Sequence, residues 1–255
     1  MKLTRRLGFL MLIGILANCT ACGSETTPVP VEESTQEETD SIVSSSEETP
    51  VLESEENSDT QELKLDHTYV TQFGTVNTVS YPCFLFDYPE NWTVTKEEVS
   101  QTDETVVLTN ERGSTITYTY IGGVAEGQLG SGSATDMTRI EFSAVADSQF
   151  IPGYVDARNY EDLGKFVVAE TKITGTMDML TDSDFIDTDG AVSFAVLPES
   201  RTGTEETTNL PLSVQNTFWY SGYVSFTAQS PDGQFTEAEQ TEVIAILSSF
   251  RVDDN

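Results

Sequence analysis

Apolar and polar residues alternate along most of the chain beyond residue 64. In the segment 115–120, Ile116, Tyr118 and Tyr120 share one face while threonines occupy the other. A period of two with a polar opposite face is typical of antiparallel strands that are buried on one side. The same pattern recurs elsewhere: Phe84, Phe86 and Tyr88; Val106 and Leu108; Val192, Phe194 and Val196; and Phe218, Tyr220, Val224 and Phe226. The sequence therefore predicts an antiparallel sheet with one apolar face.

Short polar segments separate these strands. The residues NERG at 110–113 would join two strands as a hairpin loop. Pro-Glu-Asn at 89–91 ends another strand, and Trp92 and Val94 then restart the alternation. We therefore interpret Trp92 as an anchor of the core rather than as a platform for a ligand.

The C-terminal segment 236–250 has helical spacing. Thr236 and Glu239 match a capping box, in which each residue satisfies a free backbone N–H of the first turn. The apolar residues after them recur at i, i+3, i+4 and i+7: Val243, Ile246, Leu247 and Phe250. The residues SPDG at 230–233 supply the preceding turn. We predict a helix that begins after Thr236.

A second helix is predicted over 135–148. Met137, Ile140 and Ala144 would face inward, and Asp136 would lie near the positive end of the helix dipole. Strands with one central and one terminal helix indicate the α+β class, in which helices cover an antiparallel sheet.

The N-terminus is of a different kind. Lys2, Arg5 and Arg6 precede the apolar run at 7–17. That run is about half as long as the roughly 20 residues that cross a bilayer. We therefore interpret residues 1–21 as a signal peptide.

The residues LANCTACGSE that follow resemble a bacterial lipobox. Cys22 has the small residue Ala21 before it, whereas the competing Cys19 follows Asn18. We predict lipidation at Cys22. The resemblance implies at least two acyl chains, which anchor a protein far more firmly than the reversible hold of one chain. The mature protein would be anchored at the extracytoplasmic face of a bacterial cell membrane.

A polar, acidic segment connects this anchor to the rest of the chain. Residues 22–63 contain no aromatic residue and no Lys or Arg, and they are rich in Glu, Ser and Thr. Such a composition indicates a disordered tether. Residues 64–255 are numerous enough for one well-buried core, and we interpret them as a single domain. The net charge of −31 excludes nucleic acid as a partner, because the chain would repel the phosphate backbone.

Three segments resemble the PsbP/Mog1-like family, which is common among bacterial extracytoplasmic lipoproteins: FLFDYPENWTV (84–94), VVLTNERGSTITY (106–118) and ILSSFRV (246–252). The resemblance covers roughly residues 80–121 and 235–252. It implies an α/β/α sandwich with an antiparallel sheet, and a role in binding or assembly with no catalytic residues to transfer. The acidic stretches at 176–190 and 199–209 look like insertions into that pattern.

Candidate catalytic residues are scarce. His67 is the only histidine and lies at the N-terminal margin of the domain, whereas a serine hydrolase triad needs a histidine as its base. After cleavage of the signal peptide and lipidation of Cys22, Cys83 is the one free thiol. Its neighbours in 80–86 include no basic residue that would lower its pKa. We predict that the protein is not an enzyme, and a hydrolase is the least favoured alternative.

An acidic segment at 181–190 is the candidate metal site. Four aspartates in it offer the oxygen ligands that calcium prefers: Asp182, Asp184, Asp187 and Asp189. Their spacing does not fit an EF-hand loop, because position 12 would be Val196 rather than a bidentate glutamate. We favour a solvated loop, with a weak calcium site as the alternative.

Trp219 and Tyr223 are the candidate ligand-binding residues. On one continuous strand over 216–226 they would point away from Phe218 and Tyr220, about 13 Å apart. If exposed, they could stack on sugar rings or grip a peptide. If a helix covers them, they belong to a second core layer, which is the interpretation we favour.

Together these features predict a membrane-anchored, non-catalytic binding or assembly module. Its partners would be the membrane, through the lipid, and a cell-wall glycan or an envelope protein. The alternative is a calcium- or glycan-binding surface module that uses the aspartates and the aromatic pair.

Overall fold

The structure, a computed structural model, describes residues 63–77, 80–129, 135–152 and 164–253. The predicted signal peptide, Cys22 and almost all of the predicted tether lie outside the described residues. Within the part that is described, none of the helices has the length and apolar character needed to cross a bilayer.

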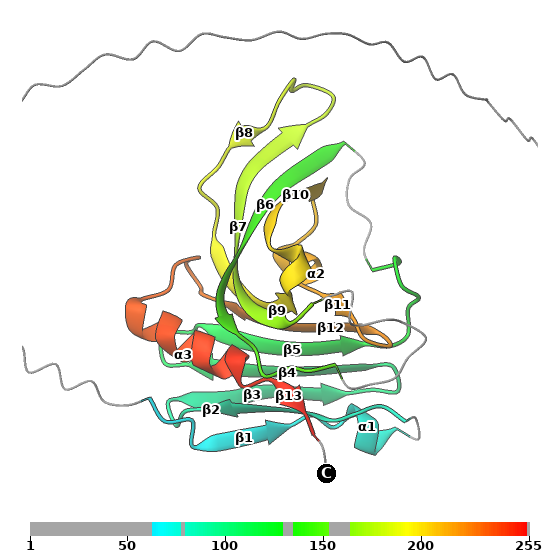
Figure 1. Ribbon diagram of the computed structural model, residues 1–255, viewed down its shortest axis with the longest axis vertical. Coiled ribbons are helices and arrows are strands. Elements are labelled where there is room, and N and C mark those ends of the chain that lie inside the picture. Colours follow the sequence, from blue (N-terminus) through cyan, green and yellow to red (C-terminus); the bar gives the residue numbers. More distant parts are fainter. Residues whose placement is uncertain (1–62, 78–79, 130–134, 153–163, 254–255) are drawn as a thin grey trace, which may run out of the picture. The chain divides into compact units, whose positions relative to one another are not determined.

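Ten strands form the main sheet, and every pairing in it is antiparallel. Their bounds are β3 (Trp92–Val99), β4 (Asp103–Asn110), β5 (Thr115–Ile121), β6 (Asp136–Asp147), β7 (Phe166–Asp178), β8 (Ile186–Asp187), β9 (Val192–Pro198), β10 (Gly203–Thr208), β11 (Phe218–Trp219) and β12 (Tyr223–Gln229). Eight of them follow the order β10-β6-β7-β9-β12-β5-β4-β3, while β8 pairs with β7 and β11 with β12 (Figure 1). The predicted hairpin loop at 110–113 is confirmed, since it joins β4 to β5.

A small second sheet and one long helix pack against this sheet. The small sheet contains β1 (His67–Val70), β2 (Phe84–Tyr88) and β13 (Arg251–Val252), in the order β1-β2-β13. The helix α3 spans Glu237–Ser248 (Figure 1). The shorter helices are α1 (Phe73–Val76), α2 (Leu212–Gln215) and the 3-10 helix Glu199–Arg201.

The larger hydrophobic core lies between these elements. Phe84 and Phe86 of the small sheet, Ile116 of β5 and Val243 of α3 are fully buried in one cluster. Trp92 also belongs to it, and its indole Nε1 donates a hydrogen bond to Glu242 of α3 (2.8 Å). The predicted apolar face and the role of Trp92 as a core anchor are therefore confirmed.

The predicted cap of α3 is confirmed as well. The side chain of Thr236 accepts a hydrogen bond from the backbone N–H of Glu239, and the Glu239 carboxylate accepts one from the backbone N–H of Thr236. This reciprocal pairing satisfies two backbone donors and fixes where the helix begins.

The helix predicted over 135–148 is wrong, because this segment forms strand β6. The buried residues are Thr138, Ile140 and Phe142, which alternate with a period of two. Ile140 and Ala144 also match helical spacing, but pairing with β7 and β10 on both sides decides in favour of the strand. The described residues thus form a mostly antiparallel β-sheet protein with few helices, and not the predicted sheet enclosed by helical layers.

A smaller apolar cluster occupies the opposite face of the main sheet. It contains Ile140 and Phe142 of β6, Val167 of β7 and Leu197 of β9, with Leu212 of α2 packed against it. The short helix α2 therefore covers part of the face that points away from α3.

Candidate functional site

Trp219 and Tyr223 lie on neighbouring strands, so the expectation of one continuous strand is wrong. The chain turns at Ser221 and Gly222, which both have positive φ, and β11 pairs antiparallel with β12. Trp219 and Tyr223 are partners in this register, and their rings meet edge to face with centroids 5.1 Å apart. Both side chains are half-buried, so the pair is neither a core layer nor freely exposed.

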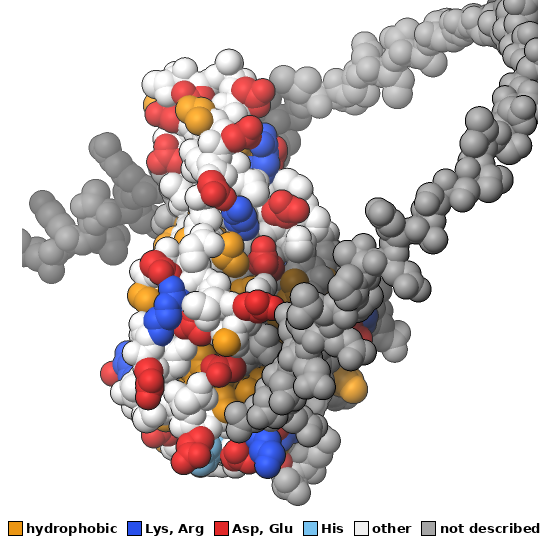
Figure 2. Space-filling model, turned by 90° about the vertical axis from the view of Figure 1, so that its left-hand side faces the viewer, with side chains coloured by type: hydrophobic (Ala, Val, Ile, Leu, Met, Phe, Trp, Pro, Cys, Tyr) orange, Lys and Arg blue, Asp and Glu red, His pale blue; other side chains and the backbone are white. Residues whose placement is uncertain are grey.

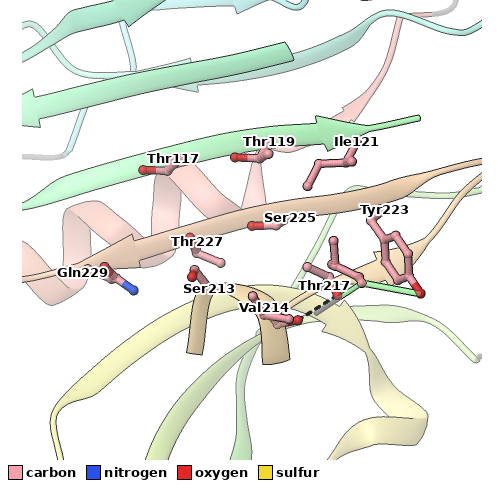
Figure 3. Close-up of a pocket in the computed structure, with 11 residues that line it drawn as sticks. Thr117, Thr119, Ile121, Ser213, Val214, Thr217, Tyr223, Ser225, Thr227 and Gln229 are labelled. Carbon is pink, nitrogen blue, oxygen red and sulfur yellow. Dashed lines mark hydrogen bonds between the residues drawn. The ribbon is translucent and has the colours of Figure 1, made fainter. Parts of the chain in front are cut away.

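A cavity of about 220 Å³ opens beside Tyr223 on the face of the sheet opposite α3 (Figure 3). Strands β5 and β12 form one wall, and α2 with the residues after it forms the other. Ile121, Leu129 and Val214 contribute apolar surface, and Gln229 contributes an amide. Besides the phenol of Tyr223, which accepts a hydrogen bond from the backbone N–H of Gly127, the cavity is lined by six aliphatic hydroxyl side chains: Thr117, Thr119, Ser213, Thr217, Ser225 and Thr227. We call this cavity the hydroxyl groove.

Most of these six aliphatic hydroxyl groups have no partner in the part of the chain that the structure describes. Thr217 donates to the backbone carbonyl of Val214 (2.9 Å), as Figure 3 shows. The other five hydroxyl side chains form no hydrogen bond to any residue that the structure describes. Ser225 and Thr227 are nevertheless 6% and 4% exposed. Among the described residues, the buried side-chain atoms without a partner are the Tyr118 hydroxyl and Asn216 Oδ1, and the hydroxyls of Ser225 and Thr227 are not among them. These two hydroxyls are therefore accessible from the groove, where they can bond to water or to a ligand.

Arg201 holds the α2 segment against the sheet. Its guanidinium pairs with Glu205 of β10, with an Nη2–Oε2 distance of 2.8 Å. It also donates to the backbone carbonyls of Gln215 (2.7 Å) and Thr217 (3.3 Å), and it lies 4.8 Å from the centroid of the Phe142 ring. One side chain thus joins β10, β6 and the wall of the groove.

Asn216 adds a second attachment from the same segment. Its amide donates to the hydroxyls of Thr171 on β7 (3.0 Å) and Ser193 on β9 (3.3 Å), and all three residues are buried. The α2 wall is therefore fixed by polar contacts to β7, β9 and β10.

The four aspartates of the candidate metal site do not converge. Asp187 pairs with Arg139 (3.3 Å) and Asp189 with Lys172 (2.5 Å). The remaining two accept backbone N–H groups: Asp182 from Asp178, and Asp184 from Phe185. Among the described residues, no group of three or more His, Cys, Asp or Glu side chains could hold a metal ion. Figure 2 likewise shows acidic side chains spread over one face of the molecule rather than gathered in a patch.

His67 and Cys83 lie apart from the groove. His67 is exposed on β1 and stacks on Tyr88, with ring centroids 5.2 Å apart. Cys83 is half-buried, and burial, followed by the charges of Asp253 and Glu104, raises the pKa of its thiol. A raised pKa leaves less thiolate at neutral pH, which disfavours a nucleophilic role.

Sequence reasoning found Tyr223 but missed the rest of the groove. The alternating threonines of β5 and the Ser-x-Thr pattern of β12 are visible in the sequence, where they indicate a solvated face. Nothing in the sequence shows that these strands are neighbours or that α2 covers them.

The comparisons with known proteins add no relative. The chain matches no protein-family model, no curated protein and no solved structure.

Proposed function

We propose that the protein is a lipid-anchored, extracytoplasmic and non-catalytic binding or assembly module whose domain resembles the PsbP/Mog1-like type. The segments that carry this resemblance come together in one core. Phe86 of β2, Trp92 of β3, Ile116 of β5 and Val243 of α3 all belong to it. This common core supports the resemblance, while the described residues contain only one long helix and so depart from a full α/β/α sandwich.

The observation that carries the proposal is the chemistry of the hydroxyl groove. Among the described residues, its lining offers aliphatic hydroxyls, one phenol, an amide and apolar groups, and it contains no Asp, Glu, His, Lys, Arg or Cys. Proton transfer or nucleophilic attack in an active site requires a group that titrates or is activated by a neighbour. A lining of hydroxyls and aliphatic groups can instead orient and hold a ligand, as most binding pockets do.

The anchor is tested by replacing the lipidated residue. In bacteria that express the full chain, Cys22→Ala should abolish labelling by a fatty-acid analogue and release the protein from the membrane fraction. Cys19→Ala is the matched control and should leave labelling and membrane association unchanged. Labelling that persists in Cys22→Ala would contradict the proposed anchor.

The second candidate function is a glycan-binding surface module, and the aromatic pair favours it. Tyr223 lines one end of the groove, and Trp219 packs edge to face against its ring. Aromatic rings next to hydrogen-bonding groups suit sugars, because one end of such a site is apolar and the other is polar. Binding of the purified full-length protein in detergent to insoluble wall glycan tests this. Trp219→Ala should reduce the bound fraction, and an unchanged fraction would remove the candidate.

A further inference from the structure

We propose that the hydroxyl groove binds one uncharged sugar unit, whose hydroxyl groups pair with the unsatisfied side chains of β5 and β12. This inference rests on the proposed binding function and names the ligand class for the same site. Thr117 and Thr119 of β5 and Ser225 and Thr227 of β12 supply the polar contacts, and Tyr223 supplies a ring at one end.

The hydroxyls that line the groove argue for a ligand that both donates and accepts hydrogen bonds. A Ser or Thr hydroxyl is one donor and two acceptors, so it matches another hydroxyl without rearrangement. The hydroxyls of Ser225 and Thr227 open onto the groove and have no hydrogen-bond partner among the described residues. A ligand that enters the groove would displace water from these hydroxyls, and a sugar hydroxyl would replace the lost hydrogen bonds.

The absence of ionic groups from the lining argues for an uncharged ligand. None of the described residues that line the groove carries a full charge. A carboxylate or ammonium group placed there would lose hydration and gain no charged partner. The volume of about 220 Å³ is below the roughly 300–1,000 Å³ that is common for drug-sized ligands, so the groove suits a single ring.

The sheet topology argues against an extended peptide. Peptides that bind to sheets usually add a strand to a free edge, where backbone groups are unpaired. Strand β5 lies between β12 and β4, and β12 lies between β9 and β5, so neither offers such an edge. The groove therefore recognises its ligand through side chains, which suits the scattered hydroxyls of a sugar ring.

The test uses the full-length protein in detergent and calorimetric titration with defined compounds. Glucose and N-acetylglucosamine, with their 1→4-linked dimers, are the neutral probes; glucuronic acid is the charged probe, and tri-alanine is the peptide probe. We expect a neutral sugar to bind and to shift the NMR signals of Thr119 and Ser225. Glucuronic acid should bind at least about tenfold more weakly, because its carboxylate would lack a partner.

Two substitutions remove hydroxyls from the groove with little change in shape. Ser225→Ala and Thr227→Val should each weaken sugar binding about threefold to tenfold, the usual worth of one hydrogen bond. Both should leave the Tm unchanged or raise it, because neither hydroxyl has a partner to lose among the residues that the structure describes. The matched control is Thr105→Val on β4. Thr105 is the register partner of Thr119 but does not line the groove, so its replacement should not change binding.

Each outcome decides the inference. Binding of a neutral sugar that both groove variants weaken and Thr105→Val does not supports it. No sugar binding, equal binding of glucuronic acid, binding of tri-alanine in the groove, or a loss of Tm in Thr227→Val would overturn it. The sugar titrations and the fatty-acid labelling of Cys22 are independent measurements. If sugar binding fails while Cys22 is labelled, the sugar site is wrong and the proposed lipid-anchored module still stands.

Discussion

The carboxylate of Glu239 joins the first turn of α3 to the loop between β4 and β5. Its Oε1 accepts hydrogen bonds from the Asn110 amide (3.0 Å) and the Ser114 hydroxyl (2.8 Å). Its Oε2 pairs with Arg112 (2.6 Å) and accepts from the backbone and hydroxyl of Thr236 (both 3.0 Å). Only 9% of the Glu239 side chain is exposed, so these contacts are shielded from water.

The pKa of Glu239 reflects how strongly these donors stabilise the ionised carboxylate. Burial raises that pKa, but the hydrogen bonds donated by Thr236, Asn110 and Ser114 outweigh burial and lower the pKa from its ordinary 4.5 to about 2. At 1.36 kcal/mol for each pKa unit, the ionised carboxylate contributes roughly 3 kcal/mol to the free energy of unfolding. Because the folded-state pKa is lowered, the contribution is fully present above pH 4.5 and is lost as the pH falls towards 2.

Glu239→Gln tests this contribution to stability, because the amide keeps the shape of the side chain and removes its charge. We expect the variant to unfold about 2–3 kcal/mol more easily than the wild type at pH 7, measured by urea denaturation. This difference in the free energy of unfolding should become smaller as the pH falls below 4.5. Glu237→Gln, an exposed residue in the same first turn, is the control and should change stability by less than about 0.5 kcal/mol.

The quantity to follow with pH is the difference in the free energy of unfolding between variant and wild type. The stability of the wild type alone is not enough, because a second carboxylate, Glu104, has the opposite pH dependence. Glu104 is fully buried, and burial raises its pKa although the backbone N–H groups of Gln72 and Phe73 donate to it. Its contribution to stability is therefore present below its ordinary pKa and is lost as the pH rises. A Glu239→Gln variant as stable as the wild type at pH 7, or a gap that stays constant down to pH 2.5, would refute the reasoning.

Three further predictions concern the core, a turn and the acidic loop. Trp92→Ala should lower the free energy of unfolding by about 3–5 kcal/mol in urea denaturation, because it empties a buried site and leaves Glu242 without the indole donor. Gly222→Ala should cost about 1–3 kcal/mol in the same assay, since φ is +143° and the new Cβ would lie 2.5 Å from the Tyr120 ring. Millimolar calcium should change the Tm no more than the same concentration of magnesium does, because the aspartates of 181–190 do not converge. A clear rise in Tm with calcium alone would contradict this.

The sequence predicted best where its pattern had one interpretation. The helix cap at Thr236 and Glu239 and the loop at 110–113 depend on contacts within a few residues, and the structure confirms both. The apolar side chains of β2, β4 and β5 alternate without any competing helical spacing, so their burial could also be predicted.

Prediction failed where local spacing allowed two interpretations. In β6, Ile140 and Ala144 fit a helix while Thr138, Ile140 and Phe142 fit a strand. The partners that decide between the two lie far away in the sequence, in β7 and β10. The turn at 221–222 was missed for a related reason. Apolar residues continue at even positions on both sides of it, so the alternation hides the reversal of the chain.

The groove could not be predicted because it depends on pairing between distant strands. Because side chains alternate along a strand, Tyr118 and Phe226 enter the core from β5 and β12, while Thr119 and Ser225 face the groove from the same two strands. Packing of the core on one face of these strands therefore fixes the spacing of the groove hydroxyls on the other face. The opposite wall is a helix of only four residues, whose position depends on Arg201 and on the buried amide of Asn216. One wall is thus set by the fold and the other by a few polar contacts, so substitutions in the α2 segment can change what the groove admits while the core stays intact.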